Sequence, residues 1–111
     1  MVFGLVVERG RGPYTVLAVH GDVDISSAPR LREKFVELVT AGSYQIVVDL
    51  EGVDFLDSTG LGVLFGALKR LRSGGGDMTV LCTQERVLEV FELTGFSRVV
   101  TVIDSLESLG R

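Results

Sequence analysis

The first apolar stretches of the chain have the spacing and composition of β-strands. Residues 5–8 and 14–20 are rich in valine, leucine and other strand formers, and the five residues between them include two glycines and a proline. Glycine and proline in so short a connection are typical of a turn between antiparallel strands. The pattern therefore predicts a β-hairpin at the start of the chain.

Three later stretches carry apolar residues at helical spacing. Residues 29–40 follow two serines and precede Gly42, a helix beginning near Thr59 ends at three consecutive glycines, and residues 85–94 precede Gly95, which we expect to be a left-handed cap. Each helix presents one apolar face to a core. The inward positions are Leu31, Phe35, Leu38 and Val39 in the first helix, Leu61, Leu64, Leu68 and Leu71 in the second, and Val87, Val90 and Phe91 in the third.

Short, almost continuous apolar runs lie between and after these helices. Residues 45–50, 78–82 and 99–103 have the pattern of strands that are buried on at least one face. Because strands alternate with helices, the connections are crossovers and the strands pair in parallel. The sequence predicts an α/β fold: an N-terminal hairpin followed by β-α-β-α-β-α, with one mixed sheet and helices packed on it. A short helix over residues 104–109 ends the series, and the strand order stays open.

Length and charge narrow the classes of partner. A chain of 111 residues corresponds to one domain, and 46% hydrophobic residues indicate a compact fold. A formal net charge of −4 offers no basic surface for a phosphate backbone, so we expect no nucleic-acid partner. The single cysteine, Cys82, excludes an internal disulfide and fits a reducing compartment.

The sequence has no pattern of a signal peptide or a membrane span. Residues 1–7 are apolar but reach charged residues at once, and the longest apolar stretch, residues 60–68, is far shorter than the roughly 20 residues that cross a bilayer. We therefore expect a cytoplasmic protein with no membrane contact. We also expect a monomer, with the apolar edge of residues 1–7 as the place where a second copy would pair.

The connection before the second helix carries the most information. Residues 51–58 exceed the roughly two to six residues that usually join a strand to a helix, and we expect Val53 and Phe55 to pack against the fold. Sites in open α/β sheets gather at the carboxyl ends of strands. Asp57, Ser58 and Thr59 fall at such an end.

Ser58 has two compatible interpretations. Its hydroxyl can cap the following helix by accepting a backbone N–H, which stabilises by about 1 kcal/mol. A serine at a helix start is also exposed, and the free N–H groups and the helix dipole tolerate a phosphate there. Gly60 and Gly62 leave the first turn without side chains, so that another protein can approach the backbone, although glycine is a poor helix former.

Other polar residues have simpler explanations. Asp22 and Asp24, before the first helix, either order the turn or line a partner-binding face beside Ser58. His20 is the one histidine and has no ligand or triad partner at suitable spacing, so a structural role is expected. Cys82 ends a strand and is expected to be a small buried hydrophobe.

One segment resembles a known family. The sequence Asp-Phe-Leu-Asp-Ser-Thr-Gly-Leu-Gly-Val-Leu over residues 54–64 resembles the signature of the STAS-domain anti-sigma factor antagonists of bacteria. Gly-Asp-Val-Asp over residues 21–24, with Ala28, Pro29 and Leu31, is similar to the family's first strand-to-helix turn, and Thr-Gly-Phe over residues 94–96 to its third helix end. The resemblance covers almost the whole chain and is greatest to actinobacterial members.

The resemblance implies a partner-switching cycle. An unphosphorylated antagonist binds an anti-sigma factor that is also a serine kinase, and the sigma factor is released. The kinase then phosphorylates the serine at the position of Ser58, the complex separates, and a PP2C-type phosphatase removes the phosphate. Thr59 is the less favoured phosphorylation position. The partner-binding residues expected on this basis are Asp22, Asp24, Asp57, Ser58, Thr59, Gly60, Leu61 and Gly62, with no catalytic residue, metal or cofactor.

Three alternatives stay open. If Ser58 were a catalytic nucleophile, it would need a base and a pocket, and the chain has no Gly-x-Ser-x-Gly elbow. A response-regulator receiver with Asp54 or Asp57 as the phosphate acceptor would need a lysine after a late strand, which the sequence lacks. A STAS module that binds a ligand, or that scaffolds a signalling complex without phosphorylation, is the third alternative.

Overall fold

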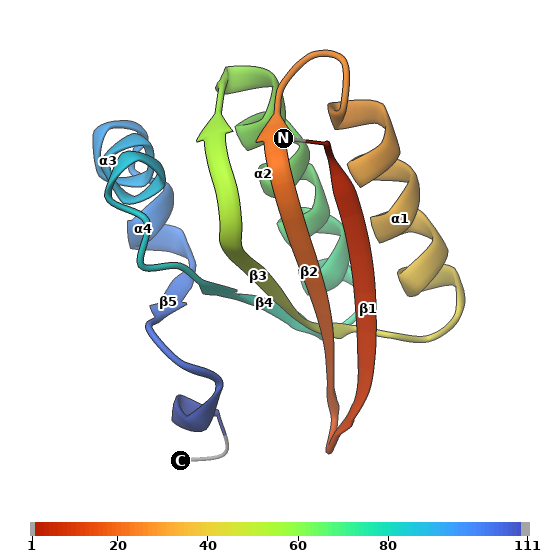
Figure 1. Ribbon diagram of the computed structural model, residues 1–111. Coiled ribbons are helices and arrows are strands. Elements are labelled where there is room, and N and C mark those ends of the chain that lie inside the picture. Colours follow the sequence, from red (N-terminus) through yellow and green to blue (C-terminus); the bar gives the residue numbers. More distant parts are fainter. Residues whose placement is uncertain (1, 110–111) are drawn as a thin grey trace.

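The computed structural model describes residues 2–109, which form one five-stranded sheet with helices packed against it (Figure 1). Met1, part of the segment expected to form an apolar edge, lies outside the described residues. The elements in chain order are β1 (Gly4–Arg11), β2 (Tyr14–Val23), α1 (Ala28–Thr40), β3 (Gln45–Leu56), α2 (Ser58–Ser73), β4 (Asp77–Leu81), α3 (Glu85–Thr94), α4 (Phe96–Val99), β5 (Thr101–Ile103) and the 3-10 helix η1 (Leu106–Ser108).

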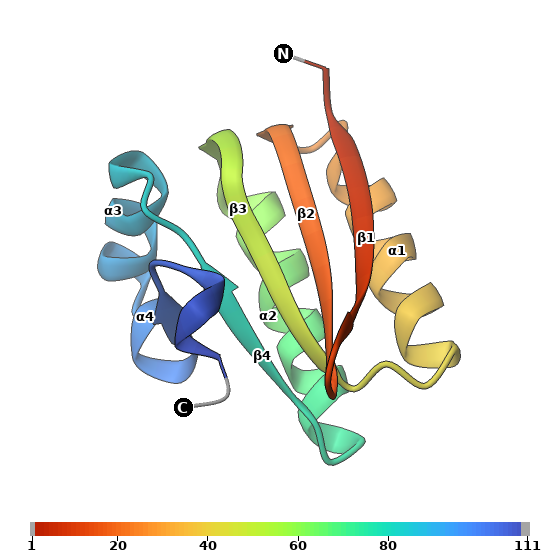
Figure 2. The same cartoon turned by 60° about the horizontal axis from the view of Figure 1, so that its bottom comes forward.

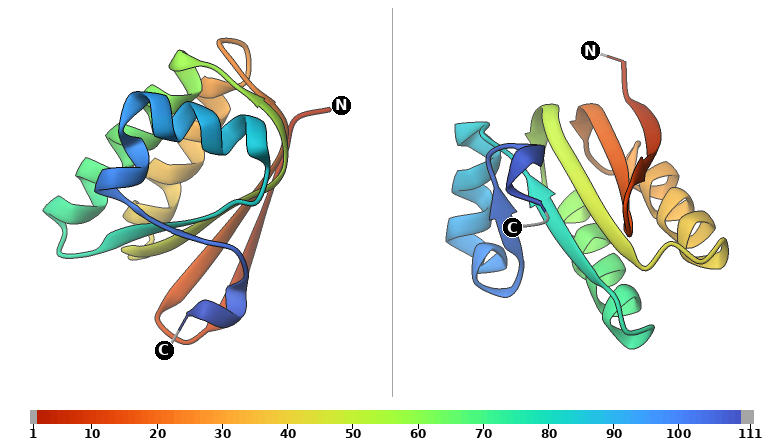
Figure 3. Two further views of the ribbon diagram at one scale, coloured as in Figure 1. Left: turned by 90° about the vertical axis from the view of Figure 1, so that its left-hand side faces the viewer. Right: turned by 90° about the horizontal axis from the view of Figure 1, so that it is seen from below.

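The strands lie in the sheet in the order of the chain, β1-β2-β3-β4-β5. β1 and β2 pair antiparallel as the predicted hairpin, and each later neighbouring pair is parallel. Crossover connections between parallel strands have the same hand. When each connection leads to the next strand in the same direction across the sheet, all connecting helices lie on the same face. The crossover helices α1, α2 and α3 accordingly cover one face, as the side view in Figure 3 shows. The predicted α/β architecture with one mixed sheet is confirmed.

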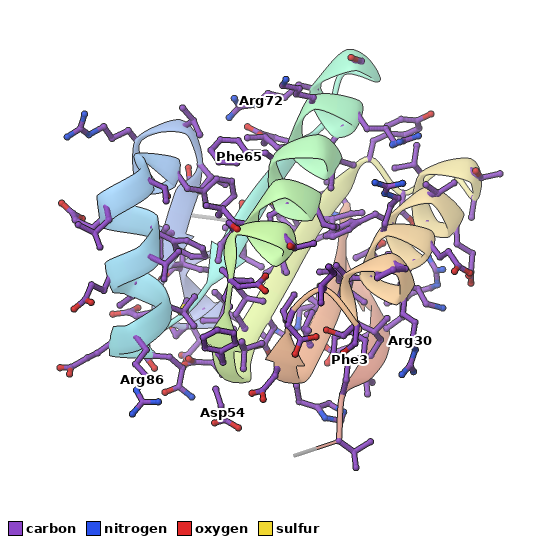
Figure 4. The ribbon with its side chains drawn as sticks, turned by 90° about the horizontal axis from the view of Figure 1, so that it is seen from above. Phe3, Arg30, Asp54, Phe65, Arg72 and Arg86 are labelled. Carbon is purple, nitrogen blue, oxygen red and sulfur yellow. The ribbon has the colours of Figure 1, made fainter. Side chains whose placement is uncertain are left out.

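The main core lies between the sheet and the helices. The four leucines predicted to face inward from α2 are at most 6% exposed, and Phe35 of α1 and Phe91 of α3 are also buried. Val39 and Val90 are half-buried at the margin of this core. Phe65 points from α2 toward the α3–α4 segment (Figure 4), where its ring meets Phe96 edge to face with centroids 4.8 Å apart. This contact joins α2 to the C-terminal helices.

The third strand is longer than predicted. β3 has twelve residues and ends at Leu56, so most of the segment expected to be a loop pairs with β2, up to the pair of Val23 with Leu56. Two register shifts interrupt this ladder. Val53, between the two shifts, and Leu56, beyond the second, take the inward positions, and Val53 is fully buried as predicted. The expectation that Phe55 packs was wrong, because the same register leaves its side chain 49% exposed.

The chain after α3 also differs from the prediction. Gly95 is left-handed, with φ of 81°, as expected. The next four residues then form α4, so Val99, predicted to begin the last strand, is helical, and β5 has only three residues. The cause is Phe96, which is fully buried and packs against Phe91 with ring centroids 4.9 Å apart. This packing draws the chain back to the core before it enters the sheet.

The C-terminal segment covers part of the opposite face of the sheet. In Figure 2 it lies in front of the strands, whereas α1 and α2 lie behind them. The predicted final helix is reduced to the single turn η1. Leu106 and Leu109 pack there against a small cluster of buried residues, Val16, Val47 and Leu81.

Within residues 2–109, no helix combines the length and the apolar character needed to cross a membrane.

Candidate functional site at the ends of strands β2 and β3

The carboxyl ends of β2 and β3 meet at one edge of the sheet, and the polar residues singled out in the sequence collect there. The ladder between the two strands ends at the pair of Val23 with Leu56. Directly beyond it, the backbone N–H of Asp57 donates a hydrogen bond to the Val23 carbonyl at 3.1 Å. This bond fixes the first turn of α2 beside the β2–α1 loop. Asp24 and Ser58 therefore belong to the same edge.

Asp57 is the N-cap of α2. Its backbone is extended, with φ of −101° and ψ of −176°, and its carboxylate accepts a hydrogen bond from the N–H of Gly60 at 3.0 Å. The bond satisfies one of the free N–H groups of the first turn, and the helix dipole favours a negative charge there. The interpretation of Ser58 as the cap was wrong by one residue, because α2 begins at Ser58 itself.

Ser58 and Thr59 occupy the first two positions of α2, and both are exposed. Neither side chain forms a hydrogen bond to another described residue. The first turn of a helix presents N–H groups and the positive end of the dipole, which together favour an anion. The Ser58 hydroxyl is thus free for covalent modification or for contact with a partner.

Asp24 orders the β2–α1 loop. Its carboxylate accepts hydrogen bonds from the hydroxyl of Ser26 at 2.7 Å, from the N–H of Ser26 at 2.9 Å and from the N–H of Ser27 at 3.2 Å. These bonds, the one from the Ser26 hydroxyl first, lower the pKa of Asp24 because they stabilise its charged form. Asp22, by contrast, is exposed, and its side chain forms no hydrogen bond or ion pair within the described part of the chain.

The remaining predicted partner-binding residues differ in burial. Gly60 and Leu61 are buried, and a Cβ atom at Gly60 would lie 2.6 Å from Cγ1 of Val23. These two residues shape the first turn from inside and offer little surface to a partner. Gly62 is exposed, and a Cβ atom added there meets no atom within 4 Å.

Sequence reasoning missed two exposed hydrophobic side chains at this edge. Ile25, in the β2–α1 loop, is 75% exposed, and Phe55, near the end of β3, is 49% exposed. Ile25 also lines a groove between α1 and α2 together with Ser58 and Thr59. The exposure of Ile25 could have been predicted, since it is a lone apolar residue in a polar loop. The exposure of Phe55 could not, because it depends on the register of β3.

His20 and Cys82 lie outside this edge group. The His20 ring packs across Gly4 of β1. Cys82 is 3% exposed, and burial raises the pKa of its thiol, helped by the negative charges of Glu51 and Asp49. Among residues 2–109, no three histidine, cysteine, aspartate or glutamate side chains are grouped as metal ligands would be.

Comparison with known proteins finds relatives of matching length. A model of the STAS domain matches residues 6–109. The anti-sigma-B factor antagonist of Bacillus subtilis (strain 168) is 36% identical over 84 residues, which are 76% of this chain and 76% of that protein. The crystal structure of an anti-sigma factor antagonist from Mycobacterium paratuberculosis has a TM-score of 0.86 and 26% identity, covering 96% of this chain and 89% of that one.

A third protein of similar fold has been solved in two states. The Bacillus cell fate determinant SpoIIAA has been solved in its unphosphorylated form, with a TM-score of 0.73 at 21% identity, and in its phosphorylated form, with a TM-score of 0.74 at 20% identity. The two alignments cover 94% and 96% of this chain and 91% and 96% of SpoIIAA. At this identity the likeness shows a shared fold.

Proposed function

This chain belongs to the STAS-domain family, and we propose that it is an anti-sigma factor antagonist that phosphorylation of Ser58 switches off. Its relatives in Bacillus subtilis and Staphylococcus aureus are anti-sigma-B factor antagonists, which are regulatory binding proteins. The observation that carries the switch is the free, exposed hydroxyl of Ser58 at the first position of α2, with the helix cap supplied by Asp57 instead.

The proposed partner is an anti-sigma factor that is also a serine kinase. The unphosphorylated chain binds it and thereby releases the sigma factor. The kinase then transfers the γ-phosphate of ATP to the Ser58 hydroxyl, with Thr59 as a secondary acceptor, and the complex separates. A PP2C-type phosphatase hydrolyses the phosphoserine and restores the binding form. The cycle takes place in the cytoplasm, and a monomer without a cofactor is sufficient for it.

A phosphate on Ser58 changes the charge of the surface without requiring the chain to refold. It adds about −1.5 to −2 charges and three acceptor oxygens, which the first turn of a helix accommodates in the free protein. In a complex the same group must lose water beside Asp57 and near Asp24. A loss of about 1.4 kcal/mol of binding free energy lowers affinity tenfold, so one unfavourably placed phosphate is sufficient to separate the partners.

We propose no catalytic role for the chain itself. A nucleophilic serine needs a general base within hydrogen-bond distance, and no described residue forms a hydrogen bond with the Ser58 side chain. The single histidine, His20, packs against Gly4 of the hairpin. Ser58 is therefore proposed as a substrate position and not as a catalytic residue.

The direct test combines sigma-factor release with phosphate mapping. The purified chain is added to the complex of an anti-sigma kinase and its sigma factor from the same organism, and ATP follows. We expect release of the sigma factor first and phosphate on Ser58 afterwards, located by mass spectrometry, while the Ser58→Ala variant releases the sigma factor and stays unmodified. Acid treatment distinguishes the two kinds of phosphate, because phosphoserine survives it whereas an acyl phosphate on Asp54 or Asp57 is hydrolysed.

Two negative results have different meanings. Failure to displace the sigma factor contradicts the antagonist function. Binding to an active kinase with no phosphate on Ser58 or Thr59 contradicts the switch alone, and the chain is then a STAS scaffold or ligand-binding module.

A further inference from the structure

A groove runs between α1 and α2, and Ser58 lies at one end of it. The groove has a volume of about 750 Å³, and its lining extends from Ile25, Ser58 and Thr59 to Val36 and Arg70. Figure 4 shows α2 between α1 and α3, with Asp54 and Arg72 near opposite ends of α2. The groove therefore continues from the Ser58 edge along the outer surface of the helix pair.

Two glycines of α2 keep this groove open. Gly62 and Gly66 both line it, both are exposed, and a Cβ atom added at either meets no atom within 4 Å. Neither has a positive φ. Alanine would therefore fit at both positions and is the better helix former. Gly60, in contrast, is required by internal packing, because a Cβ atom there would lie 2.9 Å from the carbonyl oxygen of Val23.

The groove also carries two arginines without partners. Arg32 of α1 and Arg70 of α2 line it, and neither forms an ion pair or hydrogen bond with another described residue. Arg72, two residues after Arg70, is by comparison paired with Asp77 at 3.0 Å. Glu33 is the only acidic residue in the lining. In a chain of net charge −4, this groove is thus a local site of positive charge that is open to an acidic partner.

We propose that the groove is the docking site for an amphipathic segment of the anti-sigma factor. Apolar side chains of that segment lie over Gly62 and Gly66 and against Ile25, while its acidic side chains pair with Arg32 and Arg70. This inference rests on the proposed function, because continuity with Ser58 is what assigns the groove to the same partner.

The proposal explains how a phosphate at one end of the groove weakens binding along its whole length. Phosphorylated Ser58 brings about −1.5 to −2 charges to the end of a groove that receives an acidic segment. Like charges close together repel most strongly where water is excluded. The docked segment is therefore repelled without any change in the shape of α1 or α2.

The experiment uses variants in which stability and binding move in opposite directions. Gly66→Ala should unfold at the same or a higher temperature than the unmodified chain, yet bind the anti-sigma factor at least tenfold more weakly by calorimetry. Arg70→Glu should weaken binding by a similar factor, and Arg70→Ala should make the affinity less dependent on salt. The matched controls are Leu93→Ala and Arg86→Glu on α3, which should bind as the unmodified chain does; Leu93 is 80% exposed, and Arg86 lies on the far side of α2 from α1 (Figure 4).

The outcomes separate this inference from the proposed function. If the unmodified chain binds and displaces the sigma factor while Gly66→Ala and Arg70→Glu bind equally well, the groove is not the docking site and the antagonist function stands. If Gly66→Ala binds more weakly but is also less stable, the premise of an open groove is wrong. If the unmodified chain does not bind the anti-sigma factor at all, both proposals fail.

Discussion

The carboxylate of Asp57 lies 3.0 Å from the backbone nitrogen of Gly60 and caps α2. Because this hydrogen bond satisfies the first turn, the neighbouring Ser58 hydroxyl takes no part in holding the fold together. The cap and the proposed phosphorylation position are therefore two adjacent residues. A phosphate on Ser58, as proposed, would cost the fold none of the hydrogen bonds described.

The first prediction concerns this cap. Asp57→Ala should lower the free energy of unfolding by about 1 kcal/mol, since an N-cap hydrogen bond is lost. Asp57→Asn should stay within a few tenths of a kcal/mol of the unmodified chain, because asparagine caps a helix about as well as aspartate. Urea denaturation followed by circular dichroism measures both. Equal stability of all three proteins would show that the hydrogen bond to Gly60 contributes little.

The second prediction concerns Ser58. Ser58→Ala should change the free energy of unfolding by less than about 0.5 kcal/mol, as expected for an exposed position outside the cap, and should keep its affinity for the anti-sigma factor. Ser58→Asp should bind about tenfold or more weakly, which corresponds to about 1.4 kcal/mol. Isothermal titration calorimetry gives both affinities. A large loss of stability in Ser58→Ala would show that the hydroxyl has a structural role after all.

The third prediction compares alanine substitutions at two glycines of the same helix. Gly60→Ala should destabilise by roughly 1–3 kcal/mol, the usual cost of overpacking, because the added methyl group meets Val23 at 2.6 Å. Gly62→Ala should stabilise by up to about 1 kcal/mol through helix propensity. Thermal unfolding of the two variants is the measurement. The sign of the change in stability is decisive, because a stabilised Gly60→Ala variant would contradict the packing described for the first turn.

The apolar pattern of the sequence predicted the fold well where the local spacing of residues determines the structure. The leucine stripe of α2 and the left-handed Gly95 follow from helical spacing and from glycine's access to positive φ, and both are observed. The end of β3 was not predictable in this way. Its last residues include Gly52 and two acids, which read as a loop, and only pairing with β2 holds them as a strand.

The candidate site shows the same division. The sequence correctly predicted that Asp57 and Ser58 follow the end of a strand. The prediction that Ser58 is the helix cap was wrong, because the cap residue depends on where the first hydrogen bond of the helix forms. Arg32 and Gly66 were not singled out at all. They line the same groove as Ser58 because α1 packs beside α2. A local sequence pattern does not predict this packing.

The last prediction concerns the pH dependence of the β2–α1 loop. Hydrogen bonds, first of all from the Ser26 hydroxyl, lower the pKa of Asp24 in the folded protein. A carboxyl group whose pKa is lower in the folded state stabilises that state above its unfolded pKa, and this contribution disappears as the pH falls through the folded value. The contribution of the Asp24 carboxylate to stability should therefore be complete above the ordinary pKa of an aspartate and disappear only below it. In Ser26→Ala, which lacks the hydroxyl donor at 2.7 Å, the Asp24 pKa should rise toward the ordinary value. NMR titration of the Asp24 carboxyl carbon in both proteins measures the difference, and coincident titration curves would show that the Ser26 hydroxyl does not hold this charge.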